Sequence, residues 1–300
     1  MDLNLFFNRL SIPEQISQLF YGDNPPFKQF INMLANLWKA VYINMAIQAD
    51  IKQKLSEIVI PHNRSQAEHH FWKLFLDRSC DIKWQDETMS KICDEGTKCY
   101  INNNSKDAMM LFGAYLEKLI AVSFNIDDCF SHYEIHLVRE EKGKQTDLKI
   151  HNICSIHTAK IVISEYAKKL SSNDEAQLFP IIYPGLRFCD MAIKDYCRVK
   201  GNEIFRRQSR DVLEALNKCV EETVDGILDV RCFCPNVSPD TPDSLKGDQG
   251  ERTVRCPDGK TFVFSYHVKP KATRIYYDTR YSPDRYILIG RILPIPQHPS

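Results

Sequence analysis

The sequence predicts an α+β protein, with a mostly helical body followed by a C-terminal antiparallel β-sheet of about four strands. Apolar residues recur at helical spacing in several long segments of the first 230 residues. Short alternating runs, separated by turn residues, fill the last 50. We therefore expect a helical body at residues 1–234, a linker or mobile loop at 235–250, and a basic sheet subdomain at 251–300.

The composition indicates a soluble globular protein with an uneven distribution of charge. Apolar residues make up 43% of the 300 residues and charged residues 26%. The formal net charge is zero, but residues 251–300 hold nine Lys and Arg against four Asp and Glu, a balance of +5. This basic segment predicts a local anion-binding surface. The alternative is a charged sheet face that protects an edge from aggregation.

The eleven cysteines are scattered along the chain, and their number is odd. The N-terminus lacks the basic start and apolar core of a signal peptide. No uncharged apolar run reaches about 18 residues, so no membrane-spanning helix is expected. These features predict a cytoplasmic protein with reduced cysteines.

In the first half of the body, residues 1–24 are expected to form a short amphipathic lead-in that ends at Pro25-Pro26. Helical spacing then continues from Phe27 to Met45. Ser65 and Glu68 form a capping box, which predicts that a helix begins there. A second helix, at about 106–124, is apolar on most faces and is expected to be buried.

The second half of the body is predicted to begin with two paired strands and to continue mainly as helices. The expected strands are 133–138 and 147–150, joined by a charged turn at 140–146. The expected helices are 155–170, 188–199 (a helix or a turn) and 203–224, with an extended apolar segment at 180–184 and a further candidate strand at 229–233. Arg206, Arg207 and Arg210 are expected on the solvated face of the 203–224 helix.

The C-terminal segment reads as four strands in a meander. The runs are 252–255, 261–267, 273–278 and 286–293. Pro257-Asp258-Gly259 lies between the first two runs and predicts a hairpin, because Pro presets φ and Gly accepts a positive φ.

Motifs for common cofactors and nucleophiles are missing from the sequence, and no cofactor is predicted. The chain has no Walker loop, dinucleotide fingerprint, HExxH motif or nucleophile elbow. Part of a zinc site is suggested by Cys232, Cys234 and Cys256, with His267 as the fourth ligand. The alternative is that these cysteines are small buried thiols, and no metal is assigned. Asp127 or Asp128 followed by Glu140-Glu141-Lys142 matches a metal-dependent nuclease pattern, although Glu140 falls in the expected turn.

The basic sheet provides the better candidate site. Period-two alternation places Arg274 and Tyr276 on one face of their strand. Basic groups with His and Tyr can stabilise the charge on a phosphodiester and transfer protons without a metal, and Tyr rings can stack on RNA bases. We predict His267, Lys269, Arg274 and Tyr276 as catalytic residues, and Arg255, Lys271, Arg280 and Arg291 as nucleic-acid-binding residues. The alternative is that the tyrosines pack and the cations are solvated.

Three runs of this segment carry a resemblance to a known family. Phe-Ser-Tyr-His-Val-Lys (264–269), Thr-Arg-Ile-Tyr-Tyr (273–277) and Tyr-Ile-Leu-Ile-Gly-Arg-Ile (286–292) resemble the sheet of RelE/HigB-type toxins. The resemblance implies a small α/β ribonuclease that cleaves mRNA on the ribosome. It also implies that Lys269 and Arg274 bind phosphate or act in catalysis, and that Tyr276 stacks on a base. In that family two helices directly precede the sheet, whereas here a Pro- and Gly-rich segment does.

The whole chain also resembles uncharacterised bacterial proteins found among phage-defence genes. The sequence therefore predicts a toxin-like effector of a bacterial defence or stress system that binds and cleaves RNA through the C-terminal sheet. The alternative is a non-enzymatic component of a multi-protein defence or regulatory complex, with a partner encoded nearby.

Overall fold

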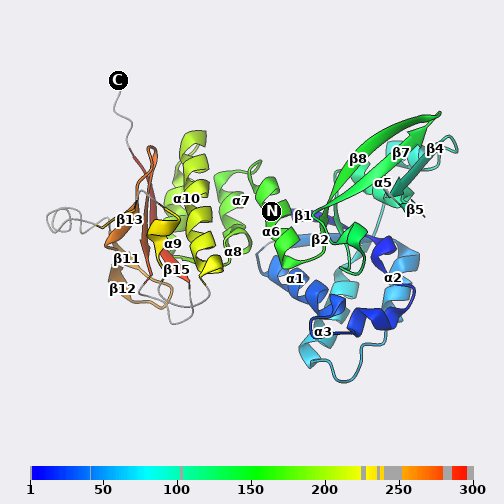
Figure 1. Cartoon of the computed structure of the whole chain (residues 1–300), viewed down its shortest axis with the longest axis horizontal. Helices are drawn as coiled ribbons and strands as arrows, with labels where there is room; N and C mark the ends of the chain where they lie inside the picture. The colour runs from blue at the N-terminus through cyan, green and yellow to red at the C-terminus, as the bar shows by residue number, and fades with distance from the viewer. Residues whose placement is uncertain are drawn as a thin grey trace. The chain divides into compact units, whose positions relative to one another are not determined.

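The computed structural model divides the chain into two compact units, residues 1–166 and 167–300 (Figure 1). It describes residues 2–40, 42–101, 104–223, 228–234, 237–239, 252–279 and 286–295. Of the segment 235–250, where a linker was expected, only residues 237–239 are described.

The first unit is built on an eight-stranded mixed sheet with the order β3-β2-β1-β6-β8-β7-β4-β5. Neighbouring strands from β3 to β8 are parallel, and those from β8 to β5 are antiparallel. The strands are β1 Asp2–Phe7, β2 Tyr42–Ile47, β3 Cys80–Asp81, β4 Thr97–Ile101, β5 Asn104–Asp107, β6 Ile120–Val122, β7 Glu134–Glu141 and β8 Lys144–Ile153. The prediction of a mostly helical body is therefore wrong.

Helices pack on both faces of this sheet. They are α1 Pro26–Ala40, α2 Ala49–Ser56, α3 Gln66–Arg78, α4 Asp86–Ile92, α5 Met109–Leu116 and α6 Ile156–Ala167, with 3-10 turns at Arg9–Ser11, Ile16–Phe20 and Asp128–Phe130. On one face, Phe7 contacts Phe30 of α1 and Phe75 of α3, with ring centroids 5.8 and 6.2 Å apart. On the other face, Phe6 packs against Trp84 and a cluster that includes Phe112 of α5.

Three predicted elements of this unit have wrong bounds or omit a strand, because parallel strands buried on both faces read as continuous apolar runs. The expected lead-in contains β1, and the helical spacing from Phe27 ends at Ala40, before β2. The expected long helix at 106–124 ends at Leu116. Lys118 adopts a left-handed conformation with φ of 57°, and the chain turns there into β6.

Two local predictions are confirmed in the same unit. The Ser65 side chain accepts from the Glu68 N–H and the Glu68 carboxylate accepts from the Ser65 N–H, so the capping box begins α3. The predicted strand pair is the hairpin β7–β8, with a turn shorter than expected. Lys142 and Gly143 have φ of 50° and 75°, as a two-residue type I′ turn requires.

The second unit has a five-stranded sheet with the order β10-β13-β14-β15-β9 and a separate two-stranded sheet, β11-β12. The strands are β9 Leu186–Phe188, β10 Val237–Pro239, β11 Thr253–Arg255, β12 Thr261–Val263, β13 Tyr266–Val268, β14 Thr273–Asp278 and β15 Ile287–Pro294. Because β9 pairs with β15 in parallel, the sheet is mixed, and the prediction of a simple antiparallel sheet is wrong.

The predicted strand positions are largely right, but their pairing differs. The hairpin around Pro257-Asp258-Gly259 forms and stands apart as β11–β12. The run 261–267 breaks at Phe264-Ser265 into β12 and β13. The expected extended segment at 180–184 contains the short helix α8 Phe179–Ile182, and the candidate strand at 229–233 contains a 3-10 turn at Val230–Cys232.

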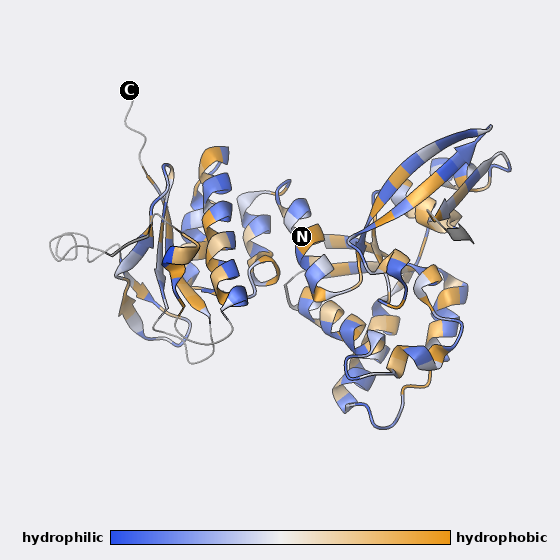
Figure 2. Ribbon diagram, in the orientation of Figure 1, coloured by the Kyte–Doolittle hydropathy of each residue, from blue (hydrophilic) through white to orange (hydrophobic). Residues whose placement is uncertain are grey.

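The remaining helices of this unit are α7 Ser172–Gln177, α9 Asp190–Arg198 and α10 Glu203–Glu222. Figure 2 shows alternating hydrophilic and hydrophobic bands along α10. This helix covers one face of the sheet, where the Ser209 hydroxyl lies 3.2 Å from that of Thr273. The other face packs with the β11–β12 hairpin through Val254, Cys256 and Phe264. Arg206, expected in solvent, is instead buried.

Candidate nucleic-acid interface

Four of the eight predicted site residues meet on the central strands of the C-terminal sheet. His267 of β13 and Arg291 of β15 both lie directly opposite Tyr276 of β14. Directly opposed residues project from the same face of a sheet. Arg274 lies two residues before Tyr276 on that face, and its Nη1 donates to the Tyr276 hydroxyl over 3.2 Å. Arg274 and Tyr276 therefore share one face of the strand, as their alternation in the sequence predicts.

The Tyr276 side chain is fully buried at the centre of this cluster. The His267 ring lies 5.7 Å from the Tyr276 ring, and the Arg252 guanidinium lies 5.7 Å from its centroid. Arg252 is itself buried, and the sequence prediction missed it. Alternation of Arg252, Val254 and Cys256 on the inner side of the hairpin was the available signal. Because Arg252 covers Tyr276, the ring holds cations in place rather than offering a free face to a base.

Arg291 is neutralised by an acid that the sequence analysis did not identify. Its guanidinium pairs with the buried Asp195 of α9, with Nη2 donating to Oδ1 over 3.2 Å and Nε donating to Oδ2. A buried ion pair of this kind fixes α9 against β15. Arg291 therefore joins the cluster mainly as a structural contact.

The other cations form an unneutralised group. Lys269 and Lys271, on either side of the turn from β13 to β14, are exposed, and Arg274 is half-buried. None of these three takes part in an ion pair in the described part of the chain. The Arg274 Nε is buried and has no hydrogen-bond partner there. This end of the sheet therefore holds three cations without an acidic partner in the described part of the chain.

One predicted nucleic-acid-binding residue, Arg255, is not brought into this group. Arg255 is exposed on β11, in the separate two-stranded sheet, and its guanidinium approaches Gly259 in the hairpin turn. Arg280 lies outside the described residues.

The two candidate metal patterns are not assembled in the described part of the chain. Within the described ranges, no group of three or more His, Cys, Asp or Glu is arranged to hold a metal ion, and this covers the Cys232 and Asp127 patterns. Cys256 lies beside Cys189 instead, in the cluster beneath the hairpin. Burial first, and the neighbouring Cys256 second, raise the pKa of the Cys189 thiol to about 12.

Differences in burial predict a clear order of thiol reactivity. Cys80 and Cys93 are exposed, whereas Cys99 is buried and desolvation raises its pKa to about 12. Since the thiolate is the nucleophile, iodoacetamide at pH 8 should alkylate Cys80 and Cys93 well before Cys99 and Cys189. Peptide mass spectrometry checks this order, with fully denatured protein as the control. Equal rates at Cys80 and Cys189 in native protein would contradict the burial of the Cys189–Cys256 pair.

Comparisons with protein-family models, with curated proteins and with solved structures found no match. Among the helices described, none combines the length and the apolar character needed to cross a membrane.

Proposed function

We propose that this protein is a toxin-like effector of a bacterial defence or stress system that acts in the cytoplasm, where it binds and cleaves RNA through its C-terminal sheet. The observation that carries the proposal is the half-buried Arg274 guanidinium, which has no acidic partner among the described residues. A planar guanidinium with unused donors suits the paired oxygens of a phosphodiester. Lys269 and Lys271 extend the same positive surface toward the next phosphates.

The cluster also contains the groups that metal-independent RNA cleavage requires. Arg274 would stabilise the extra negative charge that develops on the phosphate, with Lys269 as a second cation. His267, which lies beside Tyr276, would transfer protons to and from the ribose oxygens. Tyr276 acts as a positioning residue, because its hydroxyl accepts from Arg274.

The order of elements supports the resemblance to RelE/HigB-type toxins. That resemblance implies two helices ahead of the sheet, and α9 and α10 precede β13, β14 and β15 in the chain. α9 packs against β15, and α10 packs against β14 and β15. The segment holding β11 and β12 is then an insertion between β10 and β13 of the sheet.

The test compares wild-type protein with the Lys269→Ala/Arg274→Ala double variant for binding to fluorescent single-stranded RNA. We expect at least a tenfold loss of affinity, since each charge-assisted hydrogen bond contributes about 1.5–3 kcal/mol. Two lost phosphate contacts should also reduce the slope of log K against log salt by about 1.4. Lys218→Ala is the matched control, because Lys218 pairs with Glu222 on α10.

Expression in bacteria separates cleavage from binding. Wild-type protein should slow growth and fragment total RNA, and the double variant should do neither. Circular dichroism of the purified double variant checks that the variant folds. Purified protein should cleave RNA equally in the presence of a chelator. Unchanged binding and toxicity in the double variant would reject Lys269 and Arg274 as the site.

The second candidate function is a non-enzymatic component of a multi-protein complex. Burial of Tyr276 and pairing of Arg291 with Asp195 favour it, because they leave fewer accessible catalytic groups. It predicts a stably co-purifying partner encoded nearby and no RNA cleavage by the isolated chain. RNA cleavage that depends on Arg274 would exclude it.

A further inference from the structure

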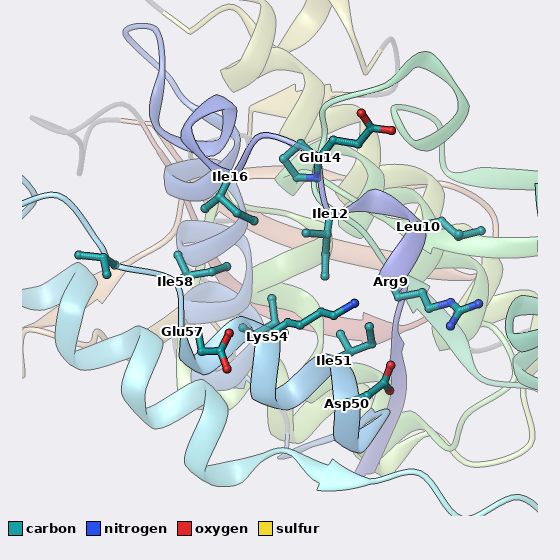
Figure 3. Close-up of a pocket in the computed structure, with 13 residues that line it drawn as sticks. Arg9, Leu10, Ile12, Glu14, Ile16, Asp50, Ile51, Lys54, Glu57 and Ile58 are labelled. Atoms are coloured by element: carbon teal, nitrogen blue, oxygen red, sulfur yellow. The ribbon is translucent and has the colours of Figure 1, made fainter.

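A cavity of about 680 Å³ lies in the first unit, far along the chain from the basic sheet. One wall is the segment from Arg9 to Ile16, which follows β1, and the other is formed by α2 and the residues after it, to Val59 (Figure 3). This volume is within the range of small-molecule sites, about 300–1,000 Å³.

The position of the cavity follows from the strand order. From β1 the chain passes to β2 and β3 on one side and later returns to β6 and β8 on the other side of β1. Open parallel sheets bind ligands outside the carboxyl ends of their strands, near this reversal. Both walls of the cavity begin just beyond the carboxyl ends of β1 and β2.

A buried hydrogen-bond network holds the first wall in place. Asn8, at the end of β1, donates from Nδ2 to the Ser123 hydroxyl over 3.0 Å, and Ser123 donates to Asn152 Oδ1 over 2.8 Å. Asn8 Oδ1 also accepts from the Leu10 N–H, and the Ser11 hydroxyl accepts from the Phe124 N–H. The segment after β1 is therefore fixed before any ligand binds, which lowers the entropic cost of binding.

The cavity lining holds two cations, Arg9 and Lys54, and three acids, Glu14, Asp50 and Glu57. Arg9 and Lys54 form no ion pair with any described residue. In Figure 3, Lys54 extends between Ile12 and Ile51 toward Arg9, whereas the Glu14 carboxylate points away from them. Asp50 lies in the first turn of α2, and Glu57 lies at the end of that helix. Apolar side chains, among them Ile12, Ile51 and Ile58, line the space between.

We propose that this cavity binds a ribonucleotide. Arg9 and Lys54 bind its phosphates, since two unpaired cations provide the donors that phosphate oxygens require. The Asp50 carboxylate accepts hydrogen bonds from the ribose hydroxyls. Asp50 follows the second strand, and in nucleotide-binding sheets of this type an acidic residue there binds the ribose. The base lies against the apolar side chains, with Glu57 able to accept from a base N–H. The chain has no glycine-rich loop after β1, so side chains rather than backbone amides hold the phosphates.

Binding is tested by calorimetry on the full chain with the four common ribonucleoside diphosphates, 2′-deoxyADP, adenosine and pyrophosphate. Thermal melting followed by Trp fluorescence gives a second readout, because Trp38, Trp72 and Trp84 all lie in the first unit. We expect at least one ribonucleotide to bind and to raise the melting midpoint. Arg9→Ala/Lys54→Ala should weaken that binding at least tenfold.

Further variants identify the parts of the ligand. Asp50→Asn should remove the preference for the ribose over the deoxyribose form, while Lys73→Ala, an exposed cation on α3, should change nothing. Melting of the unliganded double variant checks that it folds. The proposal is overturned if no nucleotide binds, if the double variant binds as tightly as wild type, or if pyrophosphate binds as tightly as the best nucleotide.

Discussion

Replacing Glu175 with alanine should destabilise the second unit by about 3–5 kcal/mol, because it removes the acid from a buried ion network. The Glu175 side chain is 1% exposed. Its Oε2 accepts from Arg206 Nη2 over 2.5 Å and from the Tyr196 hydroxyl over 2.7 Å, and its Oε1 accepts from Arg210 Nη1 over 3.1 Å. The variant would leave two largely buried guanidiniums with only the exposed Glu203 carboxylate beside them.

The matched control is Glu203→Ala, which removes another carboxylate from the same two arginines. The Glu203 side chain is 67% exposed, although it lies 2.9 Å from Arg206 Nη1. Exposed ion pairs contribute about 0–1 kcal/mol, so this variant should remain close to wild type. The two substitutions therefore separate the effect of burial from the effect of charge.

Hydrogen exchange along α10 is the suitable measurement, because the Trp residues report only on the first unit. Glu175→Ala should make the α10 amides exchange much faster, whereas Glu175→Gln should have an intermediate effect. Full protection of α10 in the alanine variant would mean that the network adds no net stability.

Replacing Gly290 with alanine should destabilise the C-terminal sheet by about 1–3 kcal/mol through overpacking. A Cβ at this position of β15 would lie 2.5–2.7 Å from three ring atoms of Phe264. Phe264 is fully buried and packs against Phe262, with ring centroids 5.3 Å apart, so the ring has little room to move. The β11–β12 hairpin would then have to shift. Arg252, whose guanidinium lies over the Tyr276 ring, would shift with it.

A double-mutant cycle tests this cause directly. Phe264→Leu creates space, so Gly290→Ala should be less harmful in that background than in wild type. Gly96→Ala is the control, because its Cβ would meet no atom closer than 3.5 Å. Hydrogen exchange of β14 and β15, together with RNA affinity, measures the effect on the fold and on the candidate site. Additive effects of the two substitutions would refute the steric explanation.

Local signals in the sequence predicted local structure well. Ser65 and Glu68 located the start of α3, and Pro257-Asp258-Gly259 located the β11–β12 turn. Alternation around Tyr276 brought Arg274 to the correct face. These features depend on neighbouring residues, whose conformations follow from sequence spacing alone.

The parallel strands of the first unit could not be predicted from local sequence signals in the same way. Its strands pair with segments distant in the chain, and Leu5, Ile43 and Ala121 are buried or nearly so whichever face they occupy. Such runs carry no alternation and resemble helix segments. The partners of Arg291 and Arg206, which are Asp195 and Glu175, likewise depended on helix packing.

The sequence by itself determined the turns, the cap, most C-terminal strand positions and the basic character of that segment. Only the tertiary structure decided which cations are neutralised by buried acids and which, such as Arg274 and Lys269, have no acidic partner among the described residues. The physical reason is that the identity of each residue gives its charge. The burial of a charged side chain and its ion-pair partner depend on contacts between residues that are far apart in the sequence.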